Sequence, residues 1–164
     1  MSRLDNIKSK IYTREQIRAV LNVWRLLEKK VVFTNGCFDL LHLGHIDYLS
    51  KAADMGDKLV IGLNSDASAS ALKGPGRPIT DQLSRSVMLA SFSFVDAVVI
   101  FDEPTPLHLI ELVRPDILVK GADYSIEQIV GADLVLQYGG EVKTIEYLSG
   151  YTTTLIEKKI RSNS

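Results

Sequence analysis

The stretch that decides the fold is Lys30-Val-Val-Phe-Thr-Asn-Gly-Cys-Phe-Asp-Leu-Leu-His-Leu-Gly-His-Ile-Asp-Tyr-Leu49. Its apolar run from Val31 to Phe33 predicts a buried strand. The chain can turn at Asn35-Gly36, and apolar residues return at helical spacing from Gly44 onward. A strand, a glycine loop and a helix in this order bring loop amides and a helix N-terminus to an anionic ligand. His42 and His45 lie next to this helix N-terminus. The stretch therefore predicts a site that binds phosphate groups and acts on them.

Composition narrows the class of protein. The 164 residues suit one domain, and 46% hydrophobic with 24% charged residues is ordinary for a globular protein. The net charge of −1 gives no general reason to expect nucleic acid or a membrane surface as partner. The single cysteine, Cys37, excludes an intramolecular disulfide framework. No apolar run approaches the ~20 residues of a membrane span, and no signal peptide is recognised, so a cytoplasmic protein is expected.

Around this stretch the chain alternates strands and helices. Residues 1–11 are expected to be lightly ordered, and Thr13 and Gln16 form a capping box for an amphipathic helix over 14–28. Gly56 is expected as a left-handed cap. Further strands are predicted at 58–63, 95–101, 116–120 and 141–145. Helices are predicted at 81–93, 105–113 with Pro106 in the first position, 125–138 with an interruption at Gly131, and 152–160. Residues 67–80 are expected to form an extended loop.

This alternation predicts an α/β fold, a Rossmann-like, doubly wound, five-stranded parallel sheet with helices on both faces. Residues 1–29 would form an N-terminal segment and helix packed on residues 30–164, within a single domain overall. Ligands of such sheets bind beyond the carboxyl ends of the strands. The segments that leave those ends are rich in glycine, hydroxyl, His and Lys residues, and they run from Thr34 to His45, Asn64 to Lys73, Gly121 to Asp123 and Tyr147 to Thr154.

Two motifs carry a family resemblance. Asn35-Gly-Cys-Phe-Asp-Leu-Leu-His-Leu-Gly-His45 resembles the HxGH signature of the nucleotidyltransferase superfamily. Gly150-Tyr-Thr-Thr-Thr-Leu155 is similar to that superfamily's second signature. Within it, Lys73-Gly-Pro-Gly-Arg-Pro-Ile79 and Arg114-Pro-Asp-Ile-Leu-Val-Lys-Gly121 most resemble the D-glycero-β-D-manno-heptose 1-phosphate adenylyltransferases. In many bacteria that activity is the C-terminal half of a bifunctional protein with a heptose 7-phosphate kinase, and this chain resembles a stand-alone version.

The chemistry explains why such residues are needed. Nucleotidyl transfer joins two polyanions, so the enzyme must position them and neutralise charge. Histidines at i and i+3 beside a helix N-terminus lie on nearly the same side, where His42 and His45 can donate hydrogen bonds to triphosphate oxygens. Lys73 is the best candidate for a mobile cation from the loop. These three residues are the predicted catalytic group.

The predicted nucleotide- and phosphate-binding residues come from the same segments. They are Thr34, Asn35, Gly36, Cys37, Phe38, Gly44, Asn64, Asp66, Arg77, Arg85, Lys120, Gly121, Asp123, Tyr151, Thr152, Thr153 and Thr154. No protein-held metal site is predicted, and Mg²⁺ is expected to arrive with ATP. Zinc is a poor alternative because only Cys37 and His108 remain as ligands, and His108 is expected at the surface.

Several of these residues have equally ordinary alternatives. Arg77 is either a second mobile cation or a solvated side chain, and Arg85 is either a ligand or a packed ion pair. Asp66 and Asp123 bind ribose or Mg²⁺, or cap helices. The three threonines suit phosphates but are also natural helix caps. Asp39 has no need for negative charge beside phosphates, so it is expected to cap its loop.

Three functions are therefore compared. The first is transfer of AMP from ATP to heptose 1-phosphate, giving ADP-heptose and pyrophosphate for lipopolysaccharide core or another heptose-containing glycan. The second is a glycerol-3-phosphate cytidylyltransferase-like enzyme that uses CTP. The third is a nucleotide-binding protein without turnover. The helix that carries Trp24 and the apolar strand at 95–101 suggest a homodimer.

Overall fold

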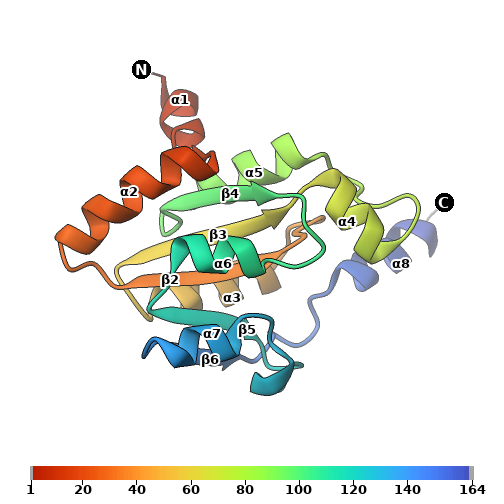
Figure 1. The fold of residues 1–164 in the computed structure, drawn as a ribbon. Coiled ribbons are helices and arrows are strands. Elements are labelled where there is room, and N and C mark those ends of the chain that lie inside the picture. The colour runs from red at the N-terminus through yellow and green to blue at the C-terminus, as the bar shows by residue number, and fades with distance from the viewer. Residues whose placement is uncertain (1, 163–164) are drawn as a thin grey trace.

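Across the residues that the computed structural model describes, 2–162, six parallel strands form one sheet in the order β1-β4-β3-β2-β5-β6 (Figure 1). The strands are β1 (Ile11–Tyr12), β2 (Val31–Gly36), β3 (Lys58–Asn64), β4 (Ala97–Phe101), β5 (Ile117–Gly121) and β6 (Glu141–Ile145). The predicted α/β class and doubly wound parallel sheet are confirmed. The count of five was one short, because β1 joins the edge beside β4.

Helices cover both faces of the sheet. α2 (Arg14–Leu26), α6 (Leu107–Val113) and α7 (Ala132–Gln137) lie on one face, and α3 (Leu43–Ala53) and α5 (Gln82–Ser91) lie on the other (Figure 1). Side chains of a strand alternate between the two cores. Val31 and Phe33 pack under α2 and α6, whereas Val32 packs with Leu49 of α3. The remaining helices are α1 (Arg3–Lys8), α4 (Asp66–Lys73), the 3₁₀ turn η1 (Ile126–Gln128) and α8 (Thr153–Ser162).

The N-terminal residues differ from the prediction. In place of a lightly ordered segment they form α1, which is closed by a capping box between Ser2 and Asp5, and then β1. β1 pairs with β4, and Ile17 and Leu21 of α2 lie in a core. Residues 2–29 thus supply an edge strand and a covering helix. Met1, Asn163 and Ser164, which the predicted domain ranges include, lie outside the described residues.

The expected loop over 67–80 was also wrong in its first half, which is α4. Ser65 caps this helix by accepting the Ser68 N–H at 3.1 Å.

Gly56 does not have the predicted left-handed backbone conformation. Its backbone runs so close to Lys30 that an added Cβ would lie 2.8 Å from the Lys30 carbonyl oxygen. Pro106 is the N-cap of α6 rather than its first residue, and Gly131, at φ 82°, separates η1 from α7.

The strand order reverses at β2. β2 lies in the middle of the sheet, with β3 on one side and β5 on the other. β2 pairs with β3 along all six residues, from Val31 to Gly36, but with β5 only through Val32 and Phe33. The two strands therefore separate toward their carboxyl ends. This is the place where open α/β sheets bind ligands.

Two elements were predicted to form a dimer surface. The apolar strand expected at 95–101 is β4, whose two edges pair with β1 and β3. The end of α2 remains open, since Leu26 is 83% exposed. Among residues 2–162, no helix has both the length and the apolar character that a membrane crossing requires.

Candidate active site

His42 and His45 cap the helix that they begin. His42 is the N-cap of α3, and its Nδ1 accepts the Gly44 N–H at 3.1 Å. The Nδ1 of His45 accepts the His42 N–H at 3.3 Å, which completes a capping box built from two imidazoles. The ring centroids lie 4.0 Å apart. The helix terminus therefore fixes both rings, and the pair that the sequence predicted does come together.

These contacts determine the tautomer and the charge of the pair. A neutral imidazole that accepts at Nδ1 carries its proton on Nε2, which leaves Nε2–H as a donor. Burial lowers the pKa of His42, and burial followed by the charge of His42 lowers the pKa of His45 to about 4. Both rings are neutral at pH 7. They offer two Nε2–H donors beside the helix N-terminus without an imidazolium charge.

Gly44 and Phe38 shape this corner. A Cβ on Gly44 would lie 3.0 Å from the His42 ring and 3.2 Å from Cβ of Tyr151, so the ring and the segment before α8 both approach its backbone. Phe38 has φ 46°, a left-handed conformation unusual for its residue type. Its ring packs over Gly36 and meets the His45 ring edge-on, at 5.6 Å between centroids. The motif thus forms a tightly packed turn around the histidines.

Asp39 has a structural role, as predicted, but it holds the loop at residues 77–80 and not its own loop. Its carboxylate accepts the backbone N–H groups of Ile79 at 2.8 Å and Thr80 at 2.9 Å, and the Arg77 Nη1 donor at 3.0 Å. Burial alone raises the pKa of Asp39, but the hydrogen bonds from these three residues outweigh burial and hold the pKa below its usual range. Lys73 is exposed at the end of α4, and its charge acts on the Cys37 thiol.

Arg85 connects three loops from inside the protein. Its side chain is fully buried and donates to the carbonyl oxygens of Thr80, Cys37 and Asn64, at 2.9, 2.6 and 2.8 Å, and to Asp66 at 2.6 Å. Of the two roles considered for Arg85, ligand binding or a packed ion pair, the structure fits the packed ion pair. The side chain of Asn64 is buried as well and donates to Ser68.

The remaining predicted residue of these loops, Cys37, is partly buried. Burial raises the pKa of the Cys37 thiol. The thiol therefore stays protonated at neutral pH and is a poor nucleophile.

Lys120 of β5 forms a side-chain link to β2 beyond the paired residues of the two strands. Its Nζ donates to the Asn35 carbonyl oxygen at 3.2 Å, and burial lowers its pKa to about 8, although Asp123 opposes that shift. The Asn35 Oδ1 atom is, among the described residues, the single buried side-chain oxygen or nitrogen without a hydrogen-bond partner. A buried acceptor without a donor is a position that a ligand can satisfy.

Two tyrosines, neither among the predicted site residues, lie beside Thr34 of β2 and Gly121 of β5. Tyr48 of α3 shares a 2.8 Å hydrogen bond with the hydroxyl of Thr34, which is fully buried. The Tyr147 ring lies 5.8 Å from the Tyr48 ring, and its hydroxyl covers Gly121, where a Cβ would lie 2.0 Å away. Burial raises the pKa of the Tyr147 hydroxyl to about 12, and the Asp123 carboxylate acts in the same direction. No sequence motif pointed to Tyr48 and Tyr147, because their contact joins chain segments about 100 residues apart.

The threonine segment approaches from the other end of the chain. Thr152 caps α8, since its Oγ1 accepts the Leu155 N–H at 3.1 Å. Thr153 is half-buried, whereas Tyr151 and Thr154 are exposed. The contact between Tyr151 and Gly44 brings this segment to the start of α3. The two motifs, which are separated by more than 100 residues in sequence, meet at one edge of the sheet.

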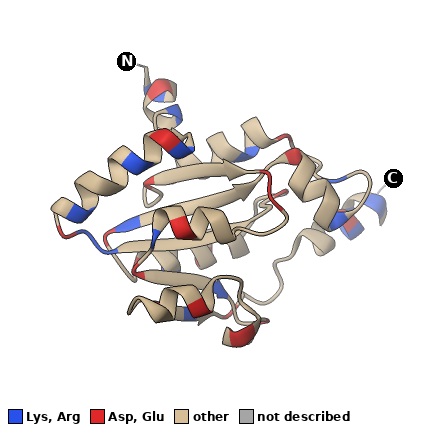
Figure 2. Ribbon diagram, viewed as in Figure 1, with Lys and Arg blue, Asp and Glu red and all other residues tan. Residues whose placement is uncertain are grey.

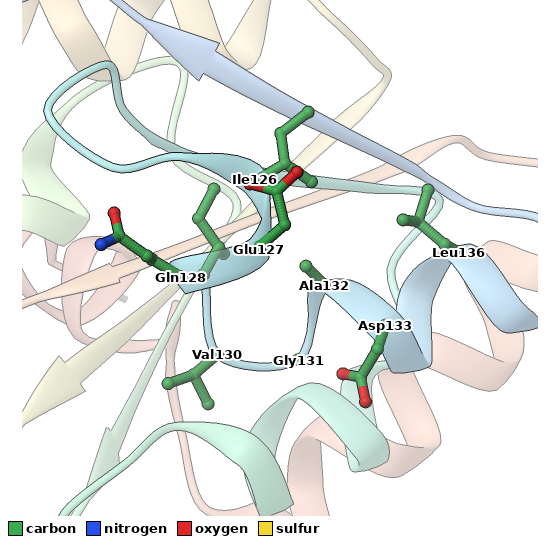
Figure 3. A pocket seen from close by; sticks show the side chains of 9 residues that line it. Ile126, Glu127, Gln128, Val130, Gly131, Ala132, Asp133 and Leu136 are labelled. Atoms are coloured by element: carbon green, nitrogen blue, oxygen red, sulfur yellow. The ribbon is translucent and has the colours of Figure 1, made fainter.

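Other surface features of residues 2–162 lie apart from this site. Within residues 2–162, no group of three or more His, Cys, Asp and Glu side chains is placed to hold a metal ion. A cavity of about 600 Å³ lies between η1 and α7, with Glu127 and Asp133 in its lining, and it includes none of the predicted site residues (Figure 3). Basic and acidic residues are mixed along α2 and α8 (Figure 2). His108, with its side chain 68% exposed, is at the surface as expected.

Known proteins match this arrangement. The sequence profile described as cytidylyltransferase-like matches residues 33–158, which contain both motifs. The chain belongs to the cytidylyltransferase-like family. Membership makes it a nucleotidyltransferase, and the predicted superfamily is confirmed.

Longer relatives share this region. The chain is 57% identical over 152 residues to the bifunctional protein HldE of Syntrophotalea carbinolica and 53% identical over 153 residues to that of Caulobacter vibrioides. Each match covers 93% of this chain but only 31% and 32% of the relative, so the chain spans about a third of the length of these curated relatives. The predicted resemblance to one part of a larger bifunctional protein is confirmed.

Solved structures share the fold. A lipopolysaccharide core biosynthesis protein from Thermoplasma volcanium is 31% identical with a TM-score of 0.60, over 76% of this chain and 99% of that one. Pantoate-beta-alanine ligase from Francisella tularensis has a TM-score of 0.64 over 92% of this chain and 76% of the other. At 17% identity, the second likeness concerns the fold alone.

Proposed function

We propose that this chain transfers AMP from ATP to D-glycero-β-D-manno-heptose 1-phosphate and releases ADP-heptose and pyrophosphate. The observation that carries the proposal is the pair of neutral imidazoles, His42 and His45, fixed at a helix N-terminus where the threonine segment meets it. Similarity to HldE proteins and to a lipopolysaccharide core biosynthesis protein supports heptose as the sugar. The product would serve lipopolysaccharide core or another heptose-containing glycan.

The reaction requires positioning more than acid–base chemistry. An oxygen of the sugar phosphate attacks the α-phosphorus of ATP, and a new P–O bond forms. The bond from that phosphorus to the bridging oxygen breaks, and pyrophosphate leaves with the electron pair. The nucleophile is already ionised, so no general base is needed. The Nε2–H groups of His42 and His45 would donate to the phosphate oxygens as charge develops on them.

Other residues would hold the reactants. The α3 N-terminus and the loop amides at Gly36 and Cys37 supply donors for phosphates. Lys73 and Lys120, whose charges both act on Cys37, would supply positive charge, and Thr153 and Thr154 would contact the leaving pyrophosphate. The Asn35 Oδ1 acceptor suits a hydroxyl or amino donor of the substrate. Mg²⁺ would enter bound to ATP as part of that substrate.

A substrate screen read by pyrophosphate release tests this proposal. With Mg²⁺, the pair of ATP and heptose 1-phosphate should release pyrophosphate faster than any other nucleotide and sugar phosphate. Release only from CTP and glycerol 3-phosphate would instead support the cytidylyltransferase alternative. A wild-type protein that binds ATP tightly and releases nothing would support the nucleotide-binding protein without turnover.

Two further properties remain proposals. A symmetric dimer through the end of α2 would cover its apolar residues Val23, Leu26 and Leu27, which are 53%, 83% and 59% exposed. Sedimentation of the wild type against Leu26→Glu tests it, since the variant should sediment as a monomer. A cytoplasmic location fits a substrate such as ATP and is checked by fractionation of cells that express the protein.

A further inference from the structure

One side chain, that of Arg77, joins three segments around the histidine pair. Its Nη1 donates to Asp39 Oδ2 at 3.0 Å, and its Nη2 donates to Glu157. Asp39 belongs to the loop that precedes the histidines, and Glu157 lies on α8, one turn beyond the threonines. The guanidinium therefore links the first motif of the chain to the helix that follows the second.

The two ends of this bridge are held differently. Asp39 is nearly buried and accepts two backbone N–H groups, from Ile79 and Thr80, so its position does not depend on Arg77. α8, by contrast, has no buried residue along its described length and lies at the margin of the fold (Figure 1). A helix with no fully buried side chain depends more strongly on its polar contacts for its position. The pair between Arg77 and Glu157 thus acts mainly on α8.

The same geometry argues against direct contact between Arg77 and a triphosphate. Both terminal nitrogens of Arg77 face carboxylates, and its side chain is only 25% exposed. A phosphate could reach the guanidinium only by displacing Asp39 or Glu157. Lys73, which is exposed four residues earlier, meets no such obstacle as a phosphate ligand.

We propose that Arg77 is a positioning residue, which holds α8 against Asp39 so that Thr152 to Thr154 stay beside His42 and His45. It acts through Glu157 and not as a ligand of the nucleotide. Only the expected effect of Arg77 on the reaction rate rests on the proposed function. The position of α8 can be measured without any substrate.

Hydrogen exchange of the ligand-free protein tests the structural half. Arg77→Ala and Glu157→Ala should each speed exchange of the α8 amides from Leu155 to Lys159, with no change in β2 or β3. Lys58→Ala is the matched control, because Lys58 and Asp96 form an ion pair of similar exposure on the sheet. Unchanged exchange in α8 of Arg77→Ala overturns the proposal, whatever reaction the protein catalyses.

A double-mutant cycle tests the kinetic half. Misplacing a contributing group by about 1 Å can cost up to about 10²-fold in rate, so each single variant should lower kcat by about 10- to 100-fold. The variant that carries both changes should be no slower than either single one, because both remove the same link. Arg77→Lys, which keeps the charge but cannot span both carboxylates, should fall between wild type and Arg77→Ala.

The opposite results are equally clear. If Arg77→Ala mainly raises KM for ATP while Glu157→Ala behaves as wild type, Arg77 is a nucleotide ligand and the proposal fails. If wild type releases no pyrophosphate from any substrate pair, the proposed function fails and the exchange experiment alone decides the role of Arg77. Thermal unfolding of each variant identifies any that fails to fold, and Glu157→Gln replaces Glu157→Ala in that case.

Discussion

His45 reaches back to the residue that begins its own helix, where its Nδ1 accepts the backbone N–H of His42 at 3.3 Å. The contact couples the capping of α3 to the chemistry of the site. A proton on the Nδ1 atom of His45 would remove the acceptor, and the ring would lose both its partner and its orientation. The same geometry that presents two Nε2–H donors therefore requires that both rings stay neutral.

Loss of the His45 donor should slow the reaction without unfolding the protein. His45→Gln keeps a side-chain acceptor for the His42 N–H, as glutamine does in ordinary capping boxes, but lacks the imidazole Nε2–H. We expect pyrophosphate release to fall by about 10²- to 10³-fold with ATP affinity nearly unchanged. His108→Gln, at an exposed histidine, is the control and should match wild type. Equal activity of both variants would contradict the role of His45.

The free energy of unfolding should decrease as the pH is lowered from 6.5, because of the His45 ring. The pKa of His45 is about 4 in the folded protein and near 6.5 in the unfolded chain, so the unfolded state binds the proton first as the pH falls. Between these values the free energy of unfolding should decrease by up to about 1.4 kcal/mol per pH unit. Denaturant unfolding of wild type and His45→Gln at pH 7, 5.5 and 4.5 measures it. A difference between them that stays constant with pH would count against the lowered pKa.

Loss of the Lys120 charge should lower the activity of the protein at alkaline pH. Burial lowers its pKa to about 8, so the folded protein loses this positive charge as the pH rises through 8. We expect kcat/KM to decrease above that pH, chiefly through a higher KM for one anionic substrate. Arg at this position stays charged, so Lys120→Arg should lose the alkaline decrease. A pH profile with the same decrease in both proteins would mean that another group titrates.

Arg85 should be required for folding stability more than for binding. Arg85→Met would leave the buried carbonyl oxygens of Cys37 and Asn64 without their donor. We expect a loss of roughly 3–5 kcal/mol in the free energy of unfolding, which denaturant titration measures. Arg14→Met breaks the exposed pair with Glu103 and should cost at most about 1 kcal/mol. Similar losses in the two variants would show that the buried network stabilises little.

The sequence predicts well wherever a local pattern carries the structure. The strand and helix around Asn35 and His45, and the structural role of Asp39, follow from spacing and residue chemistry. α4 was missed because Ala and Ser residues give it no apolar periodicity, and its cap at Ser65 has no hydrophobic residue beside it. β1 was missed because two residues form a strand only when β4 is already beside them.

Site geometry was harder to predict for a physical reason. The sequence places Arg77 and Arg85 near the site but does not reveal whether a cation faces solvent or a carboxylate. That depends on Glu157 and Asp66, whose partners are 80 and 19 residues away. Tyr147 was missed for the same reason, since its position over Gly121 arises from the packing of β5 against the segment after β6.

The early end of the pairing between β2 and β5 has a consequence for how substrate preference could change. Beyond Phe33 and Leu118 no backbone ladder joins the two strands, and the Lys120 side chain supplies a bond to the Asn35 carbonyl oxygen instead. Backbone ladders are common to every sequence with this fold, whereas a side chain is replaced by one mutation. One substitution at position 120 can therefore remove the side-chain link between β2 and β5, while the backbone pairing of the sheet around it stays the same.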